Sequence, residues 1–130
     1  MPSPRDVGVV IVAAGRGVRL GGSLPKQYLP IAGVPMLLRA IRPFSSHPDV
    51  RQVVVVLLPD VVAAPPAWLA PHVGAGLCLA AGGAERGDSV ANGLAALDPE
   101  CGIVLVHDAA RPFVSRDLLD AVIAAVGNES

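Results

Sequence analysis

The run QVVVVLL, Gln52 to Leu58, decides the fold, because it holds six successive apolar residues with no polar residue between them. A strand with one face in water alternates apolar and polar residues, whereas a continuous run is typical of a parallel strand covered on both faces. Three shorter apolar runs accompany it, at Val7–Ala13, Gly76–Ala80 and Gly102–Val106. The sequence therefore predicts a mostly parallel sheet.

Segments typical of a loop and a helix follow these runs. Pro35 is favoured at the start of a helix, and Pro43 predicts the end of the same helix. Val90, Leu94 and Leu97 form one apolar stripe at helical spacing. Strand–helix units with right-handed crossovers build a three-layer α/β/α sheet whose ligands gather at the carboxyl ends of the strands. The predicted helices are Met36–Phe44, Asp88–Leu97 and Ser115–Val126, the last with a serine cap.

The composition and length of the chain limit the classes of protein to which it can belong. The 130 residues, 52% apolar and 16% charged, predict one packed domain over residues 1–130. The net charge of −1 gives no overall basic field for nucleic acid. The longest apolar run, Val53 to Pro59, is far shorter than the roughly 20 residues that span a bilayer, and the N-terminus MPSPRD lacks signal-peptide features. We expect a cytoplasmic protein without a membrane partner.

A glycine-rich loop with three cations follows the first apolar run. Its sequence, AAGRGVRLGG over residues 13–22, lacks the third glycine of a dinucleotide fingerprint, because Leu20 stands there. The small residues let backbone N–H groups approach an anion, and Arg16, Arg19 and Lys26 carry positive charge. The loop predicts a phosphate cradle; a solvated turn with surface charges is the alternative.

Two other strand ends carry candidate binding residues. In GGAERGDSV, residues 82–90, Ser89 is either a helix cap or a ligand contact. In VHDAARPF, residues 106–113, Asp108 offers hard carboxylate oxygens of the kind that Mg²⁺ binds beside phosphates. The alternative for Asp108 is a structural one, in which it caps the following turn and pairs with Arg111.

Four motifs together, AAGRGVRLG, PKQYLPIAG, GGAERGDSV and HDAARPF, resemble the cytidylyltransferases that make 4-diphosphocytidyl-2-C-methyl-D-erythritol in the non-mevalonate route to isoprenoids. The resemblance implies a Rossmann-like nucleotidyltransferase sheet. It also implies transfer of CMP from CTP to 2-C-methyl-D-erythritol 4-phosphate with release of pyrophosphate, and Mg²⁺ or another divalent cation as cofactor.

The resemblance also implies a role for each motif residue. Arg19 and Lys26 match the catalytic cations that stabilise the transition state, and Asp108 matches the metal ligand. Arg111 matches a residue that supports its turn, whereas Arg16 stands at a position that the motif does not fix. The matches to nucleotide-binding residues are Ala13, Ala14, Gly15, Gly17, Gly83, Ser89 and Ala109.

Members of this family are considerably longer, and the part that follows the HDAARPF helix holds further strands, the acceptor-binding residues and the arm of a homodimer. We therefore expect a sheet that is incomplete at the C-terminus, with an exposed edge that favours self-association. We also expect a chain that binds CTP but is poor or inactive as a complete transferase. A ribitol-5-phosphate cytidylyltransferase and a non-catalytic CTP-binding fragment or module remain as alternatives.

Overall fold

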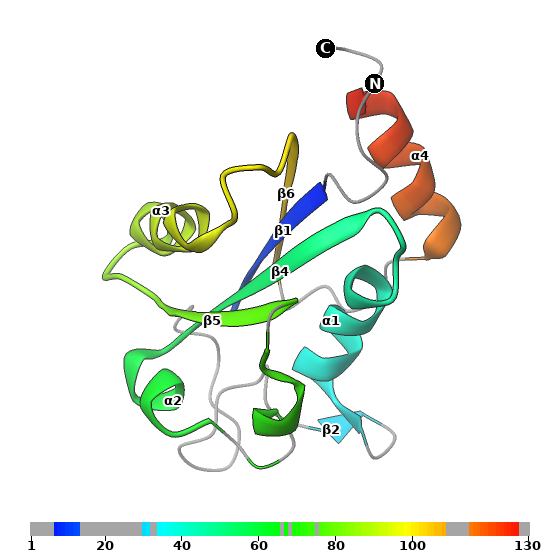
Figure 1. Ribbon diagram of the computed structural model, residues 1–130. Helices are drawn as coiled ribbons and strands as arrows, with labels where there is room; N and C mark the ends of the chain where they lie inside the picture. Colours follow the sequence, from blue (N-terminus) through cyan, green and yellow to red (C-terminus); the bar gives the residue numbers. More distant parts are fainter. Residues whose placement is uncertain are drawn as a thin grey trace.

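The structure, a computed structural model, describes residues 7–13, 30–31, 34–65, 67, 69–74, 76–108 and 115–127. Its centre is a four-stranded sheet in the order β5-β4-β1-β6, in which every strand pair is parallel (Figure 1). The predicted parallel sheet is therefore confirmed. The strands are β1 (Val7–Val12), β4 (Val50–Leu57), β5 (Leu77–Ala81) and β6 (Ile103–Asp108).

The helices cover both faces of this sheet. Helix α3 packs across β1, β4 and β5 on one face, whereas α1 and α4 lie on the other face, against β4 and β6 respectively (Figure 1). This arrangement confirms the three-layer α/β/α prediction. The other elements are β2 (Pro30–Ile31) and β3 (Val34–Pro35), which pair antiparallel, then α1 (Met36–Ser45), α2 (Pro59–Ala63), the 3-10 helix η2 (Ala70–His72), α3 (Arg86–Ala96) and α4 (Arg116–Gly127).

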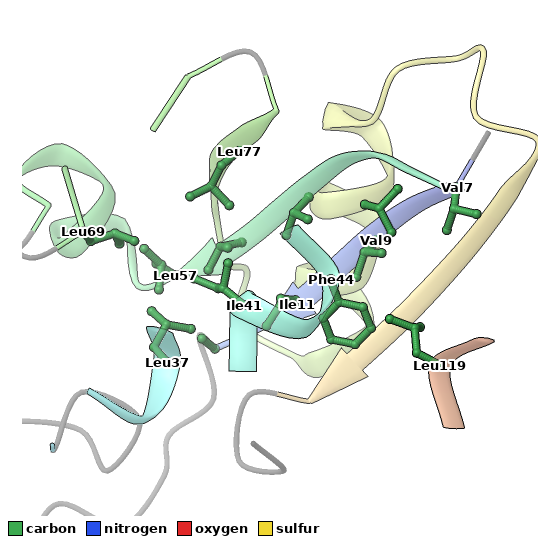
Figure 2. Close-up of a cluster of buried hydrophobic side chains, with 14 residues drawn as sticks. Val7, Val9, Ile11, Leu37, Ile41, Phe44, Leu57, Leu69, Leu77 and Leu119 are labelled. Carbon is green, nitrogen blue, oxygen red and sulfur yellow. The ribbon is translucent and has the colours of Figure 1, made fainter. Parts of the chain in front are cut away.

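The valine run lies in β4 and contributes to both of the hydrophobic cores. Val53 and Val55 belong to the larger core beneath α1 and α4, and Val56 belongs to the smaller core beneath α3. Figure 2 shows the larger core, where Ile41 and Phe44 of α1 reach toward the sheet. Because successive side chains of a strand point to opposite faces, burial on both sides requires an apolar residue at every position. This requirement explains why the run is continuous.

Helix α3 begins two residues earlier than the sequence predicts. Glu85 is the residue before the helix, and its N–H donates to the Asp88 carboxylate at 3.2 Å, which is one half of a capping box. Ser89 is therefore not the helix cap, because it occupies the fourth helical position. The predicted apolar stripe is also wrong at Leu94, whose side chain is 43% exposed.

The other two predicted helices agree closely with the structure. Helix α1 extends through Pro43 to Ser45, so that the proline falls in the last turn instead of ending the helix. At the start of α4, the Leu118 N–H donates to Ser115 Oγ at 3.0 Å, which confirms the predicted serine cap. Of the helices in the described part of the chain, none is both long and apolar enough to cross a membrane.

Candidate functional site

The register of the sheet brings the ends of all four strands to one edge. Val12 of β1 lies beside Asp108 of β6 and beside Val56 of β4, while Leu57 of β4 lies beside Ala81 of β5. Since all four strands are parallel, these residues mark the carboxyl edge, where ligands of open α/β sheets bind. Each predicted site residue that the structure describes lies at or next to this edge: Ala13, Gly83, Ser89 and Asp108.

Ala13 is buried at the end of β1 and is fixed there by the sheet ladder. Its N–H donates to the Val56 carbonyl at 2.8 Å, so that β1 remains paired with β4 one residue beyond its last strand position. Ala13, the last described residue where the glycine loop begins, is thus buried and hydrogen-bonded to β4. Residues 14–29 follow, outside the described part of the chain.

Backbone hydrogen bonds fix the turn at residues 81–83, which we call the β5 turn. The Gly82 N–H donates to the Leu57 carbonyl at 2.8 Å, and the Gly83 N–H donates to Ser89 Oγ at 3.1 Å. A Cβ on Gly83 would lie 2.3 Å from the Asp88 Cβ, a separation that no side chain can accept. Position 83 therefore requires glycine because α3 approaches the turn so closely.

Ser89 joins the β5 turn to α3. Its side chain is buried, at 4% exposed, and its oxygen accepts the Gly83 N–H. A hydroxyl group has one donor hydrogen in addition to its acceptor lone pairs. Ser89 therefore shapes the turn, and its hydroxyl keeps a hydrogen that can be donated.

Asn92 and Arg86 also reach this edge, although the sequence motifs predict a site role for neither. Asn92 Nδ2 donates to the Ala81 carbonyl at 2.9 Å, and Arg86 Nη1 lies 3.9 Å from Asp108 Oδ2. The spacing of three residues between Ser89 and Asn92, which places both on one helix face, was a signal that could have found Asn92. The contact of Arg86 depends on the packing of α3 near β6 and has no local signal in the sequence.

Asp108 lies at the last position of β6 with its side chain 45% exposed. An exposed ion pair as long as its 3.9 Å contact with Arg86 contributes little to stability. Mg²⁺ in enzymes commonly takes one or two carboxylates and completes its shell with water and phosphate oxygens. One accessible aspartate at the carboxyl edge of a parallel sheet fits that pattern. The described residues contain no group of three or more His, Cys, Asp or Glu that could hold a metal.

Seven of the predicted site residues lie outside the described residues, and their roles stay predictions. They comprise both catalytic cations, three members of the glycine loop and two residues of the HDAARPF motif. These residues are Ala14, Gly15, Gly17, Arg19, Lys26, Ala109 and Arg111.

A cavity of about 370 Å³ lies at the opposite, amino end of β4 and β5. Arg42, Ser45 and His72 contribute to its lining, but it contains none of the predicted site residues. A second space, about 190 Å³, lies between β6 and α4 and is almost entirely apolar. Neither cavity offers the combination of glycine backbone and carboxylate found at the carboxyl edge.

Comparisons with known proteins agree with the fold. The sequence profile of the family described as 2-C-methyl-D-erythritol 4-phosphate cytidylyltransferase matches residues 7–130. A protein of that name from Streptomyces coelicolor is 47% identical over 127 residues, which cover 95% of this chain and 47% of the relative. A bifunctional IspD/IspF enzyme from Rhodopseudomonas palustris (strain BisB5) is 45% identical over 135 residues, covering 98% of this chain and 32% of that enzyme.

A solved structure shows the same fold. The crystal structure of 4-diphosphocytidyl-2C-methyl-D-erythritol synthase from Anaerococcus prevotii aligns with a TM-score of 0.78 at 27% sequence identity. The alignment covers 95% of this chain and 51% of that structure. The chain thus spans about half the length of the single-function relatives that it matches.

Proposed function

Because the chain belongs to the 2-C-methyl-D-erythritol 4-phosphate cytidylyltransferase family, we propose that residues 1–130 form one nucleotidyltransferase domain that binds CTP. The domain takes part in transferring CMP to 2-C-methyl-D-erythritol 4-phosphate. The products are 4-diphosphocytidyl-2-C-methyl-D-erythritol and pyrophosphate. The observation that carries the proposal is the parallel register that aligns Ala13, the β5 turn and Asp108 along one edge.

The proposed reaction needs no general base. An oxygen of the acceptor phosphate forms a bond to the α-phosphorus of CTP, and the bond from that phosphorus to the oxygen bridging to the β-phosphate breaks. The electron pair leaves with pyrophosphate. A phosphate monoester has a second pKa of about 6, so the acceptor is mainly a dianion at neutral pH. The protein must therefore gather negative charge and hold the reacting atoms in line.

The glycine loop and its cations are proposed to perform this task. Arg19 and Lys26 bind the triphosphate and stabilise the negative charge that develops on transfer, while Arg111 supports the turn after β6. The resemblance in motif supports these roles. Backbone groups that approach the nucleotide are proposed at Ala13, Ala14, Gly15, Gly17, Gly83 and Ala109, together with the Ser89 hydroxyl.

Asp108 is the proposed ligand for Mg²⁺, and its accessible carboxylate at the carboxyl edge supports this role. A bound divalent cation supplies positive charge to the phosphates and orients them. Asp108 contributes a hard anionic oxygen, and the Arg86 guanidinium 3.9 Å away is a second positive group for the same region. The β5 turn and Ser89 lie on the side of the edge where the cytosine base is proposed to bind.

Calorimetric titration of the purified chain with CTP, and then with ATP, in the presence of Mg²⁺ tests the nucleotide site. We expect saturable binding of CTP and at least tenfold weaker binding of ATP, because a site built to hydrogen-bond one base leaves polar groups unpaired with another. Equal affinity for the two nucleotides, or no binding of either, would contradict a cytidine site.

Release of pyrophosphate tests the transfer step separately. We expect 2-C-methyl-D-erythritol 4-phosphate, and not ribitol 5-phosphate, to stimulate release from CTP. The rate should lie far below that of a full-length relative, since the chain spans about half of such a relative. Stimulation by ribitol 5-phosphate alone would assign another acceptor. CTP binding with no stimulated release would leave the chain as a nucleotide-binding part only.

A further inference from the structure

Two side chains of α3 form hydrogen bonds to the backbone of the β5 turn. Asn92 Nδ2 donates to the carbonyl of Ala81, the first residue of the turn, at 2.9 Å. Ser89 Oγ accepts the N–H of Gly83, the last residue of the turn, at 3.1 Å. Residues three apart lie on the same face of a helix. One helix face therefore holds both ends of the turn.

The middle of the turn is held from the sheet. The Gly82 N–H donates to the Leu57 carbonyl of β4 at 2.8 Å. Each of the three residues of the β5 turn thus has one backbone group bound to a different partner, on α3 or on β4. A backbone segment fixed at three successive residues cannot shift as a unit without breaking at least one of these bonds.

Helix α3, which carries Ser89 and Asn92, is itself packed closely against the sheet. A Cβ on Gly93 would lie 2.5 Å from Val10 Cγ1 and 2.8 Å from Val56 Cγ2, so α3 lies against β1 and β4 with no space for a side chain at this position. Asn92 precedes Gly93 directly. The packing of the helix on the sheet therefore fixes the backbone from which the Asn92 side chain extends, and the hydrogen bond to Ala81 holds its amide.

Helix propensity alone gives no reason for asparagine at position 92. Asn92 is exposed to solvent and lies in a middle turn of α3, where alanine is a better helix former than asparagine. An aspartate of the same shape would place acceptor oxygens against the Ala81 carbonyl, because a carboxylate has no donor. The hydrogen bond to Ala81 is the feature that distinguishes asparagine from both residues.

We propose that Asn92 is a positioning residue for the nucleotide base. The inference rests on the proposed function, in which the β5 turn faces the base of CTP. Distinguishing cytosine from uracil requires donors and acceptors at fixed places, because the two bases differ at one exocyclic group and one ring nitrogen. Asn92 does not contact the base; it fixes Ala81, and Ser89 fixes Gly83, so that the turn presents its backbone in one arrangement.

The test compares CTP and UTP affinities, measured by calorimetry with Mg²⁺, for the wild type and for Asn92→Ala. The variant lacks the donor but gains helix propensity, so we expect it to remain folded with an unfolding midpoint close to that of the wild type. We expect the ratio of UTP to CTP dissociation constants to fall at least fivefold. Most of the change should come from weaker CTP binding, because the ordered turn favours cytosine. UTP affinity should change little, because contacts with the phosphates are retained. Asn92→Asp, which keeps the shape and removes the donor, should lower the ratio as well.

Gln52→Leu is the matched control. The Gln52 amide also links a strand to its neighbours, because Nε2 donates to Cys78 Sγ at 3.2 Å and Oε1 accepts the Asp98 N–H at 2.6 Å. Gln52 lies near the amino end of β4, away from the β5 turn. A general loss of rigidity would lower the ratio of UTP to CTP dissociation constants in the Asn92 variants and in Gln52→Leu. A positioning role of Asn92 lowers this ratio only in the Asn92 variants.

The outcomes separate this inference from the proposed function. A wild type without saturable CTP binding overturns both. A wild type that prefers CTP, together with an unchanged ratio in folded Asn92→Ala and Asn92→Asp, overturns the positioning role of Asn92 alone. An equal fall in the ratio for Gln52→Leu also overturns it. A fall confined to the Asn92 variants supports it.

Discussion

At the scale of single residues, the carboxylate of Asp108 could serve either to bind a ligand or to stabilise the fold, and its contacts bear on the second role. Its carboxylate is half exposed, and its ion pair with Arg86 joins two accessible side chains across 3.9 Å. Exposed pairs of this kind typically contribute between about 0 and 1 kcal/mol to stability. The ion pair with Arg86 therefore contributes little to holding the fold, and the proposed role of Asp108 as a metal ligand is tested by removing its charge.

Asp108→Asn should weaken Mg²⁺-dependent CTP binding at least tenfold and leave the protein folded, with a cooperative unfolding transition. The amide keeps the shape of the side chain but removes the charge that a hard cation prefers. Calorimetry with Mg²⁺ and with EDTA, together with urea unfolding, measures both effects. Glu100→Gln is the control, because Glu100 pairs with Arg51 at 3.3 Å and follows α3 at the other end of the sheet. Mg²⁺-dependent binding that survives in Asp108→Asn would remove Asp108 from the metal site.

At the scale of elements, the close approach of α3 to the sheet depends on Gly93. The gap between this helix and the valines of β1 and β4 leaves no space for a methyl group at position 93. Valine side chains are short and stiff, so they cannot move aside as a long flexible chain would. The helix must shift if position 93 is enlarged.

Gly93→Ala should therefore destabilise the protein by about 1 to 3 kcal/mol, the usual effect of overpacking a core. The gain in helix propensity, at most about 1 kcal/mol, offsets only part of this. Gly87→Ala is the matched control in the same helix, because a Cβ on Gly87 meets nothing within 4 Å. It should leave stability equal to or slightly above that of the wild type. Urea unfolding of both variants gives the comparison, and equal effects of the two substitutions would contradict the packing argument.

The elements also show what the sequence can and cannot reveal. The strands are predictable because burial on both faces of a sheet requires a continuous apolar run, as at Val53 to Leu57. The start of α3 is not predictable from preferred caps, because Glu85 and Asp88 supply the cap while Ser89 offers the more familiar residue type. The spacing of Asn92 from Ser89 predicts only that both lie on one helix face; its partner Ala81 in β5 and the Asp108 partner of Arg86 in β6 depend on the topology.

At the scale of the whole molecule, the sheet ends in an apolar border at β6. In the described part of the chain, β6 pairs with β1 and is the last strand on its side of the sheet. Val104 and Val106 lie on its α3 face and are 43% and 44% exposed, while Leu118 and Val122 of α4 are exposed near the other face. An edge strand with exposed apolar residues on it is a template for pairing with another chain.

Val104→Lys should reduce self-association of the 130-residue chain. A lysine on an edge strand places a charge where a second edge would have to approach, which is a common way of preventing such pairing. Sedimentation velocity over a range of concentrations should show association in the wild type and a shift toward monomer in the variant. Val73→Lys is the matched control, because Val73 is 42% exposed but follows η2, away from β6. If the two substitutions reduce association equally, the cause is the added charge and not the edge. If the wild type stays monomeric at every concentration, the exposed valines of β6 do not drive pairing.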